Sequence, residues 1–338
     1  MPIIAVVIPC RNEQEHIRAC IESVLQSKID NDCKLQIIVI DGGSTDQTIE
    51  IIKKLSNEYS NIILLHNSHA FTPISFNMGI THASEADYIQ IVGARHLISN
   101  DYISKALSIL QVHPDIWCVG GRIYNDFLNS TSEIIAKSMG SAFGMGIGNF
   151  RTLQKSGFTD TVTSPLYPIR VFKTIGLFDA QLVRNQDDDF NYRIKLAGGK
   201  IYYEHSISLR YFVRASFKNV FKQFYQYGYW KVFVNKKHQA VTTWRQLVPP
   251  FFLLYLLGLP VMVFLSSYSL LYSIPFMLYC TLNIISSCSE FPHLKKIILT
   301  CYAYLILHVS YGMGYLHGVL RFIILGKRPE KSQTQLTR

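Results

Sequence analysis

The sequence predicts an α/β domain with an open, mostly parallel sheet, followed by a helical region that enters a membrane. Short apolar runs alternate with segments of helical spacing over about the first hundred residues, the pattern of strands joined by helices. The stretch from Gln246 to Ser289 contains no Lys, Arg, Asp or Glu. Between these regions, residues 205–245 carry eight Lys and Arg residues and no acidic residue.

The N-terminal elements follow from their apolar periodicity. Residues 3–8 are a continuous run rich in β-branched side chains, typical of a parallel strand covered on both faces. The predicted elements are, in order, strand 3–8, helix 12–27, strand 35–40, a helix after Asp46, strand 62–65 and strand 88–92. Ligands of such sheets bind at the carboxyl ends of the strands. The polar or glycine residues at these ends are Arg11, Asn12, Glu13, Asp41 and Gly93.

Composition limits the class of partner. The chain has 33 Lys and Arg against 23 Asp and Glu, a formal net charge of +10. Such a charge suits nucleic acid, anionic lipid or phosphorylated small molecules. No motif typical of nucleic-acid binding occurs, so we expect no nucleic-acid partner.

The cysteines and the N-terminus indicate a reducing compartment. The seven cysteines form no CxxC pair and have no His at zinc-site spacing, so we expect reduced thiols. The first residues lack a basic segment and read as a buried strand, which is unlike a signal peptide. The N-terminal α/β domain is therefore expected on the cytoplasmic side.

The apolar tail, residues 246–323, is predicted to be membrane-associated. Its charge-free stretch is too long for one span of roughly 20 residues. We expect helices over about 246–267, 269–289 and 297–320, followed by a polar tail, 324–338. A third full span would place Arg321 outside, against the positive-inside tendency. The third helix is therefore either a span or an interfacial or re-entrant helix.

The segment 205–245 is basic and also rich in aromatic residues. This combination beside a span is typical of interfacial helices on an anionic membrane surface. It also favours a cytoplasmic location. The alternative is a helix that only packs beneath the α/β domain, which we place at residues 1–204.

Three polar stretches carry the chemistry. Val7-Ile8-Pro9-Cys10-Arg11-Asn12-Glu13 ends the first strand, and Asp41-Gly42-Gly43-Ser44-Thr45-Asp46 ends the second. Asn185-Gln186-Asp187-Asp188-Asp189-Phe190-Asn191-Tyr192-Arg193 lies downstream. With these stretches the chain resembles the inverting family 2 glycosyltransferases of GT-A fold, and among them the bacterial exopolysaccharide glucosyltransferases of the succinoglycan type. The resemblance covers roughly residues 3–235.

The resemblance implies a nucleotide site at the strand ends. Carboxylates there accept hydrogen bonds from a base or ribose, the role that it gives to Asp41 and Glu13. Ordinary turn formation is the alternative for Asp41. The predicted nucleotide-binding residues are Pro9, Arg11, Glu13, Asp41, Asn77, Gly93 and Arg95.

The end of the fourth strand departs from the family. An Asp-x-Asp normally stands there and binds a divalent metal, Mg²⁺ or Mn²⁺, but this chain has Gly93 and Arg95 at the two positions. A diphosphate leaving group needs positive charge. Either Arg95, with His96, supplies that charge, or the protein is a non-catalytic homologue. We assign no metal ligand, with His96 as the remaining candidate.

The downstream acidic stretch is predicted to provide the catalytic base. Inverting transfer needs a carboxylate to take the proton of the acceptor hydroxyl. By register with the family's Glu-Asp motif, Asp187 is that base, while Asp189 orients the loop or the acceptor and Arg193 holds the loop. On the acceptor or diphosphate side, the resemblance places Gln223, Tyr227 and Trp230, for which interfacial anchoring is the alternative. The glycine-rich stretch 144–151 lacks the spacing of a dinucleotide-binding motif. The resemblance places a similar stretch on the acceptor side.

Together these features predict a multi-pass enzyme of the inner cell membrane. It would move a sugar, with inversion, from a UDP-linked donor to a polyprenyl-linked glycan in exopolysaccharide or surface-glycan biosynthesis. Membrane lipids and glycan-assembly proteins are its further expected partners. The alternatives are a polyprenyl-phosphate sugar synthase and a catalytically silent assembly scaffold.

Overall fold

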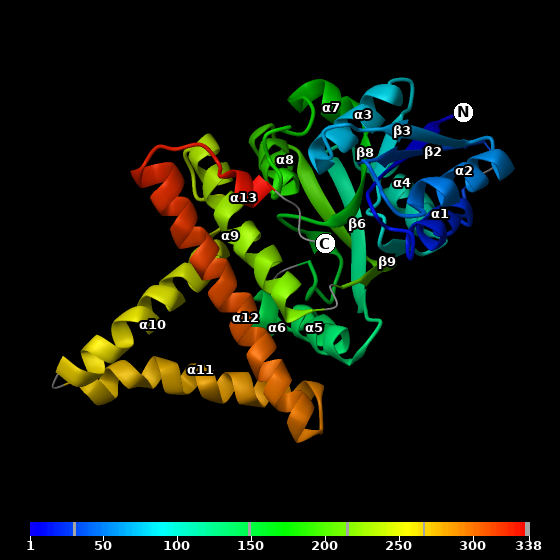
Figure 1. The fold of residues 1–338 in the computed structure, drawn as a ribbon. Helices are drawn as coiled ribbons and strands as arrows, with labels where there is room; N and C mark the ends of the chain where they lie inside the picture. Colours follow the sequence, from blue (N-terminus) through cyan, green and yellow to red (C-terminus); the bar gives the residue numbers. More distant parts are fainter. Residues whose placement is uncertain (30–31, 148–149, 214–215, 266–267, 335–338) are drawn as a thin grey trace. The chain divides into compact units, whose positions relative to one another are not determined.

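The computed structural model describes residues 1–29, 32–147, 150–213, 216–265 and 268–334 (Figure 1). The chain divides into two compact units. One unit comprises Met1–Tyr124 and Leu153–Phe212, and the other comprises Asn125–Thr152 and Val213–Arg338. Residues 125–152 thus group with the C-terminal part of the chain, whereas the sequence placed them in a domain ending at residue 204.

The first unit is built on one sheet. In the described residues its strands are β1 (Ile3–Cys10), β2 (Lys34–Asp41), β3 (Ile62–His66), β4 (Tyr88–Ile91), β5 (His96–Ile98), β6 (Ile116–Asp126), β7 (Gly157–Phe158), β8 (Thr163–Pro168) and β9 (Lys200–Phe212). They follow the order β3-β2-β1-β4-β8-β6-β9-β5, with β7 paired to β9. The half from β3 to β4 is parallel. The pairs β4–β8, β6–β8, β5–β9 and β7–β9 are antiparallel.

The predicted strands form because their side chains can be buried on both faces of the sheet. Residues 4–8 of β1 and 37–40 of β2 have no exposed surface. The helices of this unit are α1 (Ile17–Leu25), α2 (Thr48–Glu58), α3 (Thr72–His82), α4 (Tyr102–Val112), α7 (Ile169–Ile175) and α8 (Gln186–Leu196). The α/β fold class is confirmed, and the antiparallel strands enlarge the sheet beyond the predicted elements.

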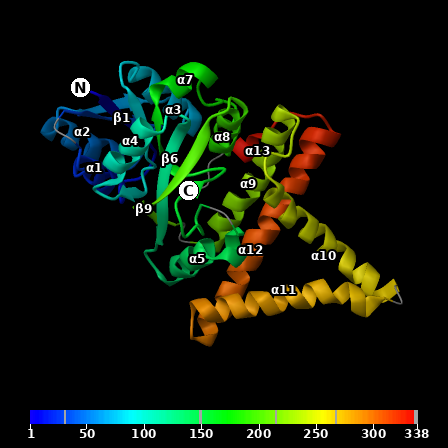
Figure 2. The same ribbon diagram turned by 180° about the vertical axis from the view of Figure 1, so that it is seen from behind.

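The second unit is helical (Figures 1 and 2). Its helices are α5 (Ser130–Gly140), α6 (Ala142–Met145), α9 (Phe217–His238), α10 (Val248–Leu265), α11 (Ser269–Glu290), α12 (Leu294–Gly318) and α13 (Lys331–Thr334). A 3-10 turn, Trp244–Leu247, precedes α10, and a π-helical turn, Val319–Ile324, continues α12. The predicted apolar helices are therefore present.

Helices α9 and α12 run side by side in the same direction (Figures 1 and 2). The rings of Phe217 and Tyr302 lie 5.3 Å apart near one end, and those of Phe233 and Phe322 lie 5.2 Å apart near the other. Glycines bring the two backbones together between these contacts. A Cβ atom on Gly314 would lie 1.9 Å from the carbonyl oxygen of Tyr225.

Three helices among the described residues are long and apolar enough to cross a membrane: Trp244–Phe264, Ser269–Glu290 and Leu294–Ile324. In the most apolar 18-residue stretch of each of the first two helices, only 6% is buried. In the corresponding stretch of the third helix, 44% is buried. The difference arises because α12 packs along α9, while α10 and α11 expose their apolar side chains.

Residues 125–152 join the second unit through apolar packing on α12. Ile134 of α5 forms a buried cluster with Phe291 and Ala303. The ring nitrogen Nε2 of His308 lies 3.0 Å from the carbonyl oxygen of Phe143, and the Phe143 ring meets the Tyr304 ring edge-on. Burial of these rings explains why the segment leaves the sheet unit. Residues 148–149 of the predicted glycine-rich stretch lie outside the described residues.

Gly314→Ala is expected to lower the midpoint of thermal unfolding. Its Cβ would collide with backbone, which cannot move aside as a side chain can, and overpacking of this kind costs about 1–3 kcal/mol. Gly258→Ala in α10 is the matched control, because a Cβ there meets nothing within 4 Å. Equal midpoints for the two variants in detergent would contradict the close approach of α9 and α12.

Candidate active site

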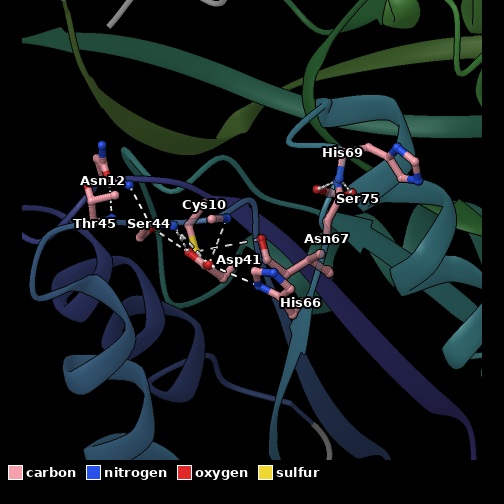
Figure 3. Close-up of polar contacts among 11 residues, drawn as sticks. Cys10, Asn12, Asp41, Ser44, Thr45, His66, Asn67, His69 and Ser75 are labelled. Atoms are coloured by element: carbon pink, nitrogen blue, oxygen red, sulfur yellow. Dashed lines mark hydrogen bonds and ion pairs between the residues drawn. The ribbon is translucent and has the colours of Figure 1, made fainter.

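The turn after β2 is shaped by Asp41 (Figure 3). Its carboxylate is almost fully buried and accepts hydrogen bonds from the backbone N–H of Gly43 (2.9 Å) and from the backbone and hydroxyl of Ser44. Gly43 has a φ of +79°, a conformation that glycine adopts without steric cost. The predicted nucleotide-binding carboxylate therefore also fixes the loop that a ligand would approach.

The loop after β1 is hydrogen-bonded to this turn (Figure 3). Asn12 donates its backbone N–H to Ser44 Oγ at 2.8 Å, and its side-chain oxygen accepts the Thr45 N–H at 2.8 Å. The Gly42 N–H donates to the Cys10 carbonyl at 2.9 Å. The first two sequence stretches thus form one connected surface at the carboxyl edge of the sheet.

Pro9 and Arg11 border that surface. Pro9 pairs in register with Ile40 of β2 at the end of the parallel ladder. Arg11 follows the strand, and its Nε is buried without a hydrogen-bond acceptor among the described residues. A buried donor of this kind costs free energy unless a partner is supplied, so Arg11 is a candidate contact for an anionic ligand.

His66 extends the same edge and was not predicted from the sequence. It is the last residue of β3, and its Nδ1 lies 3.5 Å from Asp41 Oδ2 (Figure 3). Its side chain is 64% exposed, so it presents a polar ring beside the buried carboxylate. Its position at the end of the third parallel strand was the available signal, the same signal that identified Asp41.

Two predicted nucleotide-binding residues meet in an ion pair. Arg95 donates from Nε to Glu13 Oε2 at 2.8 Å, and both side chains are largely buried. The Glu13 carboxylate, in the loop after β1, therefore holds the Arg95 guanidinium near the end of β4. The pair uses Nε, while a guanidinium has five N–H donors in all.

His96 occupies the space beside Gly93. Its Nδ1 lies 2.7 Å from Ser164 Oγ and 3.3 Å from the Gly93 backbone nitrogen. A Cβ atom on Gly93 would lie 3.1 Å from the His96 ring. The His96 ring therefore occupies the space into which an aspartate side chain at position 93 would extend. A glycine at position 93 is compatible with a histidine at position 96.

The described residues do not fit a divalent metal at this position. Arg95 is a cation, and Nδ1 of His96 faces the Ser164 hydroxyl. Within the described ranges, no three His, Cys, Asp or Glu residues are grouped so that they could hold an ion. Carboxylates and neutral imidazoles are the usual ligands, and this end of β4 offers neither in a usable cluster.

The buried thiols near the edge are packing groups. Burial raises the pKa of Cys20 to about 12. Burial and the nearby Asp41 carboxylate also raise the pKa of Cys10. Both thiols therefore stay protonated at neutral pH, which disfavours a nucleophilic role.

The acidic stretch forms the start of α8. Asn185 adopts a left-handed conformation before the helix, and Asp187, Asp188 and Asp189 occupy the first turn. Asp187 is exposed, Asp188 is half-buried and Asp189 is fully buried. The positive end of the helix dipole favours these charges. Asp187 is thus the member of this turn that is most open to an acceptor.

Arg193 and Asn77 position this turn. Arg193 Nε lies 3.0 Å from Asp189 Oδ2, and its Nη groups donate to the carbonyls of Ile175 and Leu177. The side-chain amide of Asn77 exchanges two hydrogen bonds with the backbone of Phe178. These contacts tie the chain before α8 to the sheet unit, so Asp189, Arg193 and Asn77 have positioning roles in this structure.

The predicted acceptor residues lie on α9 in the second unit. Gln223 donates to the Tyr227 hydroxyl at 2.8 Å. Trp230 has no exposed surface, and its indole N–H donates to the carbonyl of Gln333 at 3.1 Å. In this structure Trp230 is therefore buried and hydrogen-bonded to the C-terminal segment.

Comparison with known proteins assigns the family. The model of glycosyl transferase family 2 matches residues 5–176. The chain belongs to this family. Its predicted membership is thus confirmed, and the chain is a family 2 glycosyltransferase.

Two curated relatives of this family 2 glycosyltransferase are described by their products or acceptors. The chain is 30% identical over 266 residues to the dolichyl N-acetyl-alpha-D-glucosaminyl phosphate 3-beta-D-2,3-diacetamido-2,3-dideoxy-beta-D-glucuronosyltransferase of Methanococcus voltae, with 77% of this chain and 81% of the relative covered. It is 28% identical over 246 residues to succinoglycan biosynthesis protein ExoA of Rhizobium meliloti (strain 1021), with 72% and 73% covered.

Solved structures show the same fold. The mannosyltransferase PcManGT of Pyrobaculum calidifontis, solved with GDP-Man and Mn²⁺, matches with a TM-score of 0.65 at 14% identity over 93% of this chain and 86% of that one. S. aureus TarS 1–349, solved with UDP, matches with a TM-score of 0.51 at 15% identity over 97% and 92%. The predicted GT-A fold is confirmed for this family 2 glycosyltransferase.

Proposed function

We propose that this family 2 glycosyltransferase moves a sugar, with inversion, from a UDP-linked donor to a lipid-linked oligosaccharide in exopolysaccharide or surface-glycan synthesis. The observation that carries the proposal is the arrangement of polar groups at one edge of the sheet, with an exposed carboxylate at Asp187. Two relatives support the acceptor class, because one is named for a dolichyl phosphate-linked substrate and the other for succinoglycan biosynthesis.

The donor nucleotide would bind over the loops after β1 and β2. Backbone turns fixed by Asp41 and Asn12 present a rigid surface. The Asp41 carboxylate and the exposed His66 ring offer polar partners for a base or ribose. The buried Nε of Arg11 supplies a donor for an anionic group. Preformed groups of this kind bind a ligand without the cost of ordering a loop.

Asp187 would act as the general base of a single displacement. The acceptor hydroxyl oxygen attacks the anomeric carbon and loses its proton to the Asp187 carboxylate. The bond from the anomeric carbon to the diphosphate oxygen breaks, and its electron pair leaves with the nucleoside diphosphate. Asp189 cannot take this part, because it is fully buried and paired with Arg193.

Asp187→Asn is expected to lower turnover by 10²–10⁴-fold, the usual contribution of a positioned base. Asp188→Asn is the matched control, since it removes a neighbouring charge from the same helical turn, and it should stay within about threefold of the parent. Initial rates of sugar transfer at saturating donor measure both. An Asp187→Asn enzyme within threefold of the parent would refute the assignment.

Arg95 would stabilise the leaving diphosphate in place of a metal. Glu13 orients its guanidinium through Nε, and the remaining N–H donors suit phosphate oxygens. A fixed cation in a partly buried site stabilises developing negative charge efficiently. We therefore infer transfer that does not depend on Mg²⁺ or Mn²⁺. The alternative function is a catalytically silent scaffold, which the presence of Gly93 and Arg95 in place of the family's Asp-x-Asp also suggests.

UDP release from a panel of UDP-sugars is expected to continue in EDTA at a rate within about twofold of that with Mg²⁺ or Mn²⁺. Arg95→Met should lower the rate by about 10²–10³-fold, as loss of a leaving-group stabiliser does. Arg95→Lys keeps the charge and should retain part of the activity. Loss of activity in EDTA would overturn the metal-free inference. UDP binding without release from any donor, with acceptor present, would favour the scaffold.

We further propose that α10 and α11 enter the inner membrane from the cytoplasmic side and that α12 lies at its surface beside α9. The five lysines of α9 disfavour burial of that helix in lipid. Because α12 runs along α9, both helices would lie at the same depth in the membrane. Arg321, Lys327 and Arg328 then stay on the cytoplasmic side, as the positive-inside tendency requires.

Reporter fusions test this topology. A C-terminal GFP fusion is expected to fluoresce, and a C-terminal alkaline phosphatase fusion to be inactive, because the C-terminus stays in the cytoplasm. The same reporters fused after α10 should give the reverse result. An active phosphatase at the C-terminus would show that α12 crosses the membrane.

A further inference from the structure

The carboxylate of Glu330 lies in a cluster of hydrogen-bond donors in the second unit. Its Oε1 is 3.5 Å from Arg321 Nη1 and 3.5 Å from His317 Nε2. The other ring nitrogen of His317 lies 2.6 Å from the Tyr225 hydroxyl. The Glu330 backbone N–H donates to the Tyr229 hydroxyl at 3.1 Å. The cluster thus joins α9, α12 and the π-helical turn around one anionic group.

The segment that carries Glu330 also covers α9 (Figures 1 and 2). The Gln333 carbonyl accepts the indole N–H of Trp230 at 3.1 Å and the side-chain amide of Gln226 at 3.4 Å. Trp230 has no exposed surface and also packs against the rings of Tyr229 and Phe233. Displacing residues 330–334 would therefore uncover a tryptophan that the sequence resemblance placed on the acceptor side.

Glu330 is unusual in its part of the sequence. After Glu204, the only carboxylate side chains in the chain are those of Glu290 and Glu330. Glu290 pairs with the exposed Lys137, whereas Glu330 inserts between a guanidinium and an imidazole. An acidic side chain in such basic surroundings occupies a place that would otherwise attract an external anion.

The contacts of Glu330 are loose for a charged pair. Both separations are 3.5 Å, whereas charge-assisted hydrogen bonds are about 2.7–2.9 Å long. The side chains of Glu330, Arg321 and His317 are each 23–34% exposed, so water and ligands reach them. A phosphate has more acceptor oxygens than a carboxylate and would engage the guanidinium, the imidazole and a tyrosine hydroxyl together.

We propose that Arg321, His317, Tyr225 and Tyr229 form a binding site for a phosphate group carried on a lipid, and that Glu330 occupies this site as an internal substitute. The site lies at the end of α12, beside the basic helix α9, where a headgroup would meet cationic side chains. Binding of the lipid phosphate displaces residues 330–334 and uncovers Trp230. The choice of lipid rests on the proposed function, in which the acceptor is lipid-linked.

Quenching of Trp230 fluorescence by acrylamide tests the site. The full chain with Trp117→Phe and Trp244→Phe keeps Trp230 as its single tryptophan. In detergent, a polyprenyl phosphate is expected to increase quenching, while the matching polyprenol and inorganic phosphate at the same concentration are not. An equal increase in acrylamide quenching with polyprenol, or an increase with inorganic phosphate alone, would overturn the assignment of a lipid-borne phosphate.

Two glutamate variants make the test independent of misfolding. Glu330→Gln removes the competing charge and is expected to bind polyprenyl phosphate about tenfold more tightly, the size of one charged hydrogen bond. Glu290→Gln is the matched control and should leave the affinity unchanged. Arg321→Gln should lose binding. Equal affinities for the two glutamate variants, or full affinity in Arg321→Gln, would refute the site.

UDP binding and release are measured on the same preparations. A normal Trp230 response without UDP release from any donor would count against the proposed function and leave the phosphate site standing. UDP release with transfer to a lipid-linked acceptor, but no Trp230 response, would support the proposed function and count against the phosphate site.

Discussion

Burial of β1 and β2 on both faces is the constraint from which the first unit is built. No polar side chain can be placed along the middle of strands whose residues have no exposed surface without a large desolvation cost. The polar residues therefore collect where the strands end. There the buried Asp41 carboxylate accepts the N–H groups of its own turn, and Asn12 links the turns that follow β1 and β2. The polar edge of the first unit is thus a consequence of the buried sheet.

Two ion pairs join largely buried side chains of the first unit. Arg95 lies 2.8 Å from Glu13, and Asp189 lies 3.0 Å from Arg193. Breaking such a pair is costly because it leaves a buried charge uncompensated. Asp189 is fully buried and paired with Arg193, whereas Asp187 in the same helical turn is exposed.

The second unit depends on close approach of α9 and α12. Gly228 and Gly314 allow backbone atoms of the two helices to touch, and aromatic rings pack at both ends of the contact. Helix α9 carries five lysines, whereas α12 is apolar enough to cross a membrane. Such a pair suits the boundary between water and lipid, while α10 and α11 are apolar enough to cross a membrane and largely exposed.

The sequence by itself determined the parallel half of the sheet, the polar residues at its edge and the three apolar helices, because these depend on local periodicity and on the length of charge-free segments. It did not reveal His66 beside Asp41, the Arg95–Glu13 pair, the two bonds between Asn77 and Phe178, or the grouping of residues 125–152 with α12. These contacts join residues far apart in the chain. Likewise, covering of Trp230 by the C-terminal segment was decided only by tertiary structure, since its hydrogen bonds link positions 103 residues apart. Local pattern reports which face of an element is apolar, but the partner of a polar group depends on which elements the fold brings together.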